Sequence, residues 1–424
     1  MNTSWKDNNT LRRYEEAQVT PAVLKHMDHQ EDLVYYGEIG VRMLIDTLED
    51  VYSYLTSNVP SHGSRITQKI DGSPAVLAAT DFNGEKFVAL KHSWDKGKRF
   101  HSEEELKEYY KDSPELLDKL ISLFNYIDKI GIPKDQIWMG DYLFSNRDLE
   151  SVEIEGESYV VFRPNTVVYA VPETDPLAKK IREADIGIVW HTKYTGTFEE
   201  LKKSFDVSLD SVNTIPEVFQ SDVNMNFNSV LFSKEETETI TSLMERLNRA
   251  ADSLISDPHY EMIIQNKKVV ARMQKYKNEI IRQHEVELGD YFSAQNLKAI
   301  MVDEINSHIA GLSRSNDIAR NEKARDALSQ FLDDTADAIE KFYNVQALCV
   351  ELKNMFIRKM EKSVGMRMFY QSLTRGYIPC GAEGFVVSDA EGNVAKLVTR
   401  IGFSLANWQQ DIIKGWMSDK RENS

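Results

Sequence analysis

The sequence of 424 residues contains only two cysteines, Cys349 and Cys380, and they form no Cys-x-x-Cys pair. This scarcity excludes a cysteine zinc site and a disulfide scaffold, and it fits a reducing cytoplasm. No apolar run is long enough to span a bilayer, and residues 1–13 lack the apolar centre of a secretory signal. We therefore expect a cytoplasmic protein that makes no contact with a membrane.

The sequence also lacks an excess of positive charge, because the formal net charge is −16. A protein that coats nucleic acid over its whole surface is excluded, although a local basic groove is not. The histidines form no His-Glu-x-x-His zinc motif. His26 and His29 are three residues apart and could share a helix face, for which a partly exposed helix start is a better interpretation than a metal site.

Hydrophobic spacing in the first 200 residues predicts a mixture of helices and strands. Residues 34–55 have apolar positions at helical spacing, and residues 103–130 predict a helix that ends at Gly131. Two apolar segments around a turn at Asn83-Gly84 predict an antiparallel hairpin. Further strands are predicted in QIWMGDYLF, ESYVVFRP, NTVVYAV and IGIVWH.

Residues 197–369 show almost no strand pattern. Ser233 and Glu236 predict a capping box at the start of one helix, and residues 334–359 predict another long helix. Near the C-terminus, AEGFVVSD and NVAKLVTR predict two strands joined by a turn at Glu391-Gly392-Asn393. The expected fold is α+β: an antiparallel-sheet body, residues 1–200 and 370–424, interrupted by a large all-helical insert, residues 201–369.

The segment Lys69-Ile70-Asp71-Gly72 has the composition of a reactive lysine site. A free lysine has a pKa near 10.4 and is a poor nucleophile at neutral pH, but burial or a nearby cation lowers that pKa. On the expected strand Lys69, Asp71 and Ser73 alternate and would project to one face, while Gly72 permits close backbone approach. The alternative interpretation is a surface turn beside a solvated lysine.

Four further segments follow in a fixed order, and with the lysine segment they resemble a known superfamily. QKIDGSPAV resembles motif I, WMGDY motif III, AEGFVV motif IV and AKLV motif V of the covalent nucleotidyltransferases, which include ATP-dependent DNA ligases, RNA ligases and mRNA capping enzymes. Phe162 or Tyr169 would be the aromatic residue of motif IIIa. The resemblance covers both parts of the expected body and implies a ligase adenylation-domain fold.

The resemblance implies a role for each matching residue. Lys69 would be the nucleophile that carries AMP, assisted by Glu383 and Lys396, and Asp141 and Glu383 would be ligands of Mg²⁺ or Mn²⁺. An aromatic ring would stack on adenine. The nucleotide-binding residues implied for ATP are Gln68, Asp71, Gly72, Lys91, Asp141, Phe162, Tyr169 and Lys396.

Among the branches of the superfamily, the sequence is most similar to RNA ligases of the phage tRNA-repair type. KFVALKHSWDKG resembles their motif Ia region, in which Lys91 would contact the nucleotide. Only 28 residues follow Lys396, too few for the oligonucleotide-binding barrel of DNA ligases and capping enzymes. Several strings also resemble proteins of large tailed phages, which implies a viral origin and a host cytoplasm. The implied activity is ATP-dependent joining of 3′-OH and 5′-phosphate RNA ends.

Two departures from the motifs leave alternatives open. Val398 occupies the place of a second motif V lysine, for which Arg400 is a candidate replacement, and Asp141 stands where a longer glutamate is usual. One alternative is a transferase that passes AMP or GMP to another acceptor without sealing ends. Another is a phage protein without enzymatic activity that keeps a degenerate nucleotide pocket.

The expected helical insert contains two basic stretches, residues 266–277 and 313–325. Tyr276 is their only aromatic residue and acidic neighbours are plentiful, so solvated helix faces are the favoured interpretation. If the insert does bind RNA, Lys267, Lys268 and Lys275 are the expected contacts; a protein partner is the other possibility.

Overall fold

The computed structural model describes residues 28–57, 59, 61–80, 84–196, 198, 200–225, 231–284, 286, 289, 291–388, 394–401 and 411–413. His26, Asn83 and the expected turn at residues 391–393 lie outside these ranges. The principal helices are α2 (Gly37–Ser57), α3 (Lys91–Trp94), α4 (Glu103–Tyr109), α5 (Pro114–Ile130), α6 (Pro176–Glu183), α7 (Lys234–Ile255), α8 (Pro258–Gln265), α9 (Lys267–His284), α10 (Ala294–Ala310), α11 (Ser315–Asp334) and α12 (Ala336–Met360), with short 3-10 helices that include η2 (Gln30–Tyr36).

The described strands form three sheets that are mostly antiparallel. Sheet A has the order β1 (Asp28–His29), β15 (Val394–Leu397), β14 (Phe385–Ser388), β2 (Arg65–Gln68). Sheet B has the order β10 (Lys202–Ser204), β9 (Ile186–Thr195), β5 (Gln136–Ser145), β3 (Ala75–Thr80), β4 (Lys86–Leu90), and β11 (Val218–Asp222) also pairs with β9. Sheet C has the order β13 (Gly376–Cys380), β12 (Arg367–Ser372), β8 (Val167–Pro172), β7 (Glu157–Phe162), β6 (Glu150–Ile154).

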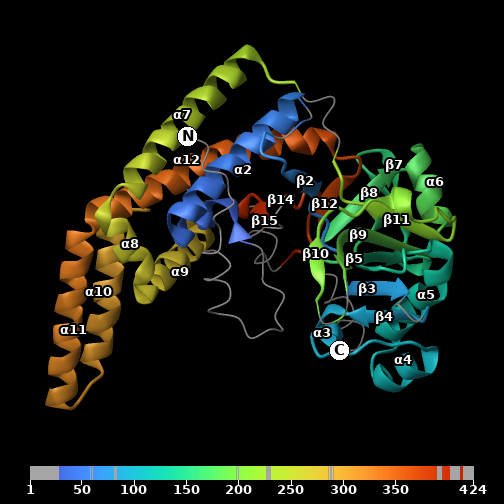
Figure 1. Cartoon of the computed structure of the whole chain (residues 1–424), viewed down its shortest axis with the longest axis horizontal. Coiled ribbons are helices and arrows are strands. Elements are labelled where there is room, and N and C mark those ends of the chain that lie inside the picture. The colour runs from blue at the N-terminus through green and yellow to red at the C-terminus, as the bar shows by residue number, and fades with distance from the viewer. Residues whose placement is uncertain are drawn as a thin grey trace.

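Sheet A lies against the long helices with one face only. Ile66, Phe385 and Leu397 on that face belong to the same buried core as α2, α7 and α12. Side chains alternate along a strand, so Thr67, Val386 and Lys396 are carried by the opposite face. Figure 1 shows α2, α7 and α12 side by side on one side of the molecule and the other two sheets on the other side.

Sheet B has two differently covered faces. Val76, Val88 and Trp138 pack against a core that includes residues of α4 and α5. Leu77, Ala89, Met139 and others on the opposite face are covered by Trp94, Phe198 and Leu201. Sheet C contributes a third core with the ends of β5 and β9. Asp141 follows Met139 in phase on β5 and therefore projects from this second face of sheet B.

The expectation of a strand-free segment at residues 197–369 is wrong at both of its ends. β10 and β11 lie there and pair with β9 of sheet B, and β12 begins sheet C pairing before residue 369. The helices run from α7 to α12, Lys234–Met360. These helices share one hydrophobic core with α2, which lies near the beginning of the chain. The segment therefore does not form a core of its own.

Several local predictions are confirmed. The helix predicted at residues 34–55 is α2 preceded by η2. The helix predicted at residues 103–130 is divided into α4 and α5 before Pro114, but its predicted end is confirmed, since α5 ends at Gly131, whose φ of 72° is the left-handed conformation of a helix end. Ser233 accepts a hydrogen bond from the Glu236 amide at 3.1 Å, and the Glu236 carboxylate accepts one from the Ser233 amide at 2.7 Å. β3 and β4 form the predicted hairpin.

Two predictions near the lysine segment are wrong. β2 ends at Gln68 and pairs with β14, so it does not continue into the β3–β4 hairpin. β4 ends at Leu90, and Lys91 begins the short helix α3. His29 lies at a partly exposed helix start, as expected, because it is the N-cap residue of η2; it also lies in β1 opposite Lys396, where burial, followed by the charge of Arg400, lowers its pKa to about 3.

The described residues contain no helix that is both long enough and apolar enough to cross a membrane.

Candidate functional site

Lys69 lies in a loop that connects sheet A to sheet B. Its backbone N–H donates to the Gly384 carbonyl at 2.8 Å, which extends the β2–β14 pairing by one residue. Ile70 is buried in the core of sheet C, with Phe162 and Tyr169. The strand expected for Lys69, Asp71 and Ser73 is therefore absent, but Lys69 and Asp71 still project together, since their side chains are hydrogen-bonded while Ile70 points into the core.

A continuous hydrogen-bonded network joins Lys69 to Glu383. The Lys69 ammonium donates to the Asp71 carboxylate, and the Asp71 backbone N–H donates to Glu383 Oε2 at 2.5 Å. The Tyr169 hydroxyl donates to the same Glu383 oxygen at 2.7 Å. Segments more than 300 residues apart in the sequence thus meet, because residue 71 follows β2 and residue 383 precedes its neighbour β14.

The environment of Glu383 favours its protonated form. Burial is the main cause that raises its pKa to about 7, and the negative charge of Asp71 raises it further, against the opposing charge of Lys69. Burial and the adjacent Glu383 also raise the pKa of Tyr169 well above its usual range. Tyr169 therefore keeps its proton and acts as a hydrogen-bond donor. A cation near Glu383 would favour loss of the Glu383 proton.

Asp141 lies directly beside the Asp71-Gly72 segment. A Cβ at Gly72 would be 2.6 Å from the Asp141 Cβ and 2.6 Å from the Tyr142 carbonyl oxygen, so only glycine fits. Asp141 comes from β5, and its carboxylate is 3.9 Å from His191 Nε2 of β9. His191 was not identified from the sequence, and its position after an apolar strand run was the only indication.

Lys396 belongs to the same site. It is carried by β15 opposite Val386, on the face of sheet A that the helices do not cover. Burial and then the charge of Lys69 lower its pKa. Strand register brings Lys396 to the same face as Lys69, because Lys396 is opposite Val386, Val386 is opposite Thr67, and Lys69 follows Thr67 in phase. A second cation beside Lys69 is the arrangement needed to receive an anionic phosphate.

The aromatic residues are placed differently from the expectation. Phe162 and Tyr169 are both buried, and their rings stack on each other with centroids 5.4 Å apart and an angle of 15°. Phe144 covers Phe162 from another side at 4.9 Å. Neither ring offers an open face for adenine, so Phe162 is a core residue and Tyr169 acts through its hydroxyl on Glu383.

Gln68 and Lys91 lie near the hydrogen-bonded network of Lys69, Asp71 and Glu383, but their side chains form no hydrogen bond with it among the described residues. Gln68 is buried in β2, and within the described part of the chain its side-chain Nε2 has no hydrogen-bond partner. An unpaired buried donor is costly and is typical of a ligand site. Lys91 follows Leu90, which pairs with Val76, one residue from the Ala75–Asp141 pair. Lys91 therefore lies at the same end of sheet B as Asp141.

Arg400 does not stand in for the missing motif V lysine. Its guanidinium pairs with Asp32 and, through Nε, with Glu31 at 2.9 Å. Glu31 also accepts from the fully buried Lys353 at 2.9 Å, and Lys277 is 3.6 Å away. This buried charge cluster was missed from the sequence because its members come from η2, α9, α12 and the segment after β15.

The basic residues of the helical segment are largely paired with acids. Arg272 pairs with Glu279 and Glu304, and Lys275 lies 3.6 Å and 3.9 Å from the same two carboxylates. Lys277 is buried in the charge cluster. Lys267 and Lys268 are exposed.

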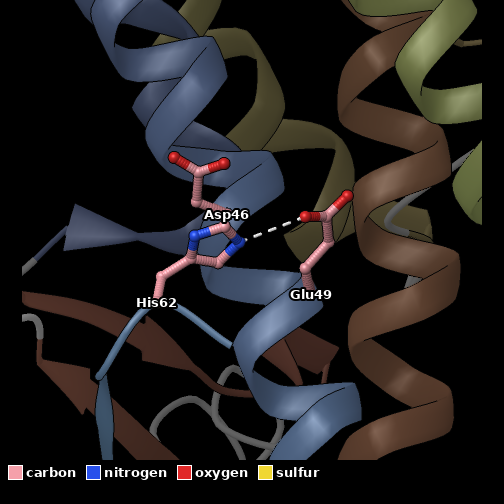
Figure 2. Close-up of side chains that lie close together, drawn as sticks. All are labelled: Asp46, Glu49 and His62. Carbon is pink, nitrogen blue, oxygen red and sulfur yellow. Dashed lines mark hydrogen bonds and ion pairs between the residues drawn. The ribbon is translucent and has the colours of Figure 1, made fainter. Parts of the chain in front are cut away.

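A separate group of possible metal ligands lies on α2 and the loop after it. Figure 2 shows Asp46 and Glu49 on the helix and the His62 ring directed toward them. Their ligand atoms lie within 4.8 Å of one another, the one such group of three among the described residues. His62 already contacts Glu49 at 3.2 Å and is exposed to solvent, so we assign it no part in the candidate site.

A comparison with protein families gives one match. The model of a family of unknown function (DUF6267) matches residues 24–411. The chain belongs to this family. The match to this DUF6267 family spans all three sheets and the helices from α7 to α12. No curated protein and no solved structure matches the chain.

The raised pKa of Glu383 gives a prediction for Glu383→Gln. The folded-state pKa lies above the unfolded value, so wild-type stability falls as pH rises from about 4.5 to about 7 and stays lowered above that. Glutamine removes this cost, so we expect the variant to gain about 2 kcal/mol in unfolding free energy at pH 8 and nothing at pH 4. Urea denaturation at both pH values measures the difference.

Glu173→Gln is the matched control for this prediction. Hydrogen bonds from Arg182 lower the pKa of Glu173, so its neutralisation should not stabilise the fold at any pH. A Glu383→Gln protein no more stable than wild type at pH 8 would contradict the described environment of Glu383.

Proposed function

We propose that the protein is an ATP-dependent nucleotidyltransferase of the RNA-ligase type, in which Lys69 carries AMP. One observation carries the proposal: Lys69, Asp71, Glu383 and Lys396 come together from the two ends of the chain. These are the residues that the motif resemblance implies for the reaction, and the network between them depends on the pairing of β2 with β14.

In the proposed first step the Lys69 nitrogen attacks the α-phosphorus of ATP. The N–P bond forms while the bond from phosphorus to the bridging oxygen breaks, and pyrophosphate leaves with that electron pair. Asp71, hydrogen-bonded to the Lys69 ammonium, first accepts one proton and so frees the lone pair for the attack; a second proton passes from the new phosphoramidate nitrogen to solvent. Lys396 stabilises the charge that develops on the phosphate oxygens.

Residues of the site suit a divalent cation next to the phosphates. Asp141 and Glu383 supply the carboxylate oxygens that Mg²⁺ or Mn²⁺ prefers, and a bound cation would neutralise the phosphate charge. The raised pKa of Glu383 fits this arrangement, since a nearby cation favours the ionised carboxylate. His191 beside Asp141 can orient that carboxylate.

A second candidate is transfer of AMP or GMP to an acceptor without sealing. The ion pairs of Arg400 favour it, because they leave Lys396 as the one motif V cation at the site. A smaller positive charge holds phosphate less strongly during the two steps that follow in sealing, which are transfer of AMP to the RNA end and joining of the ends.

The experiment supplies labelled ATP or GTP with Mg²⁺ or Mn²⁺ and follows label on the protein, then adds nicked RNA, nicked DNA or single-stranded RNA. We expect label from ATP and joining of RNA ends. Labelling without joining of any strand would favour the second candidate. No labelling under any condition would overturn both and favour a degenerate nucleotide pocket.

A further inference from the structure

A group of basic side chains comes from α3 and the segment after it, which follow the edge strand β4, and from β10, the opposite edge strand of sheet B. Three of them are exposed and two are half-buried, in a chain whose net charge is −16. We call this group the α3–β10 surface, and it consists of Lys91, Lys96, Lys98 and Arg99 in and after α3, with Lys203 of β10; the neighbouring Lys202 projects to the opposite face of the sheet.

The cations of the α3–β10 surface form no ion pairs. Across the described ranges none of its five side chains lies in a salt bridge, whereas neighbouring Lys193 pairs with Asp206 at 3.1 Å. Partial burial, and then the charge of Lys91, lowers the pKa of Lys203. Cations that are not paired with acids are typical of a surface that receives an anion.

Aromatic rings are interleaved with these cations. The Arg99 guanidinium lies 3.8 Å from the ring centre of Phe198 and 5.5 Å from that of Trp94. The Lys203 ammonium lies 4.5 Å from the ring centre of Phe205. Alternating cations and rings suit single-stranded nucleic acid, whose bases stack while its phosphates pair with the cations.

Strand register connects the α3–β10 surface to the Lys69 site. Lys203 is opposite Tyr194, and Tyr194 is opposite Ile137 of β5. Asp141 follows in phase with Ile137 on β5, so its side chain emerges from the same face of sheet B. A polynucleotide bound along this face of sheet B would run from β10 past Asp141 to Lys69.

We propose that the α3–β10 surface binds the backbone of a single-stranded polynucleotide and directs its end to Lys69. This inference rests on the proposed function and names the partner of the same site. It differs from the contact expected at Lys267, Lys268 and Lys275 of the helical segment, of which Lys275 is already close to Glu279 and Glu304.

The test compares Lys203→Glu with the control Lys267→Glu, and Lys96→Glu/Lys98→Glu with the control Lys267→Glu/Lys268→Glu. Each control carries the same change in charge as its surface variant. Binding of a short fluorescein-labelled single-stranded RNA, and of DNA with the same sequence, is measured by anisotropy across a salt series. Self-adenylylation with ATP, which needs no polynucleotide, is measured in the same samples as a check of folding.

We expect both surface variants to bind the RNA about tenfold more weakly, with the salt slope reduced by about 0.7 per lysine, and both controls to bind as wild type. Weaker binding only in the controls, or wild-type binding in both surface variants, would overturn the α3–β10 surface. A wild-type protein that binds neither RNA nor DNA would also overturn it. Weakened RNA binding together with a wild-type protein that takes no AMP would support the surface and reject the lysine chemistry.

Discussion

Lys69→Arg is expected to form no AMP adduct. The arginine keeps the positive charge and can still pair with Asp71, so the loop and its network are preserved. A guanidinium stays protonated in proteins, however, and it therefore has no lone pair with which to attack phosphorus. Incubation with ATP and Mg²⁺ followed by intact-mass measurement should show complete loss of the adduct that the wild type forms.

Lys129→Arg is the control for this substitution, because Lys129 is an exposed lysine whose partner is Glu217. We expect full loading of that variant. Lys396→Arg should load at least tenfold more slowly without losing the reaction, because it keeps the cation and changes only its geometry. Loading of Lys69→Arg at the wild-type rate would mean that Lys69 is a structural residue.

Glu31→Ala is expected to have the largest effect on stability. Glu31 is fully buried and its carboxylate is shared by Lys353, Lys277 and Arg400. Its removal takes the carboxylate away from the buried Lys353 and leaves one acid, Asp32, beside Lys277 and Arg400, which costs about 3–5 kcal/mol. Urea denaturation followed by circular dichroism measures the loss, and a loss below about 1 kcal/mol would contradict the buried charge cluster.

The pH dependence provides a second test of Glu31. Burial alone would raise its pKa, but Lys353, Lys277 and Arg400 outweigh burial and hold the pKa well below its ordinary value. The stabilisation is therefore present at neutral pH and is lost as pH falls through that lowered pKa, so the difference from Glu31→Ala should shrink in acid. Glu38→Ala, at an exposed pair with Arg42, should cost about 0.5 kcal/mol or less.

The same substitution should also affect the candidate site. Glu31 follows β1, and Arg400 follows β15, the strand that carries Lys396. Their pairing fixes the edge of sheet A against η2. We therefore expect Glu31→Ala to slow self-adenylylation even in the fraction that stays folded.

Elements with a strong local pattern could be predicted from the sequence. α2 and α5 have apolar faces at helical spacing, and the capping box at Ser233 is a local motif. β10 and β11 could not be predicted in this way, because KKS and VFQSD are short and largely polar. Both are strands only because they pair with β9, which is a property of the fold and not of their own sequences.

The candidate site could be predicted only in part, because motifs are local patterns and tertiary packing is not. The order of the motifs predicts that Lys69, Asp71, Glu383 and Lys396 belong to one site. Chemistry that depends on tertiary packing was missed, such as the Tyr169 hydroxyl on Glu383. The stacking role expected for Phe162 or Tyr169 was wrong because sequence does not show which rings are enclosed by others.

The most direct test of lysine adenylylation is to locate the adduct. The full-length protein is incubated with ATP and Mg²⁺, digested at neutral to alkaline pH to preserve a phosphoramidate, and its peptides are sequenced by tandem mass spectrometry. The account predicts AMP on the peptide that contains Lys69, removed on addition of pyrophosphate because the first step is reversible. AMP on a different lysine, or no AMP on any peptide, would contradict it.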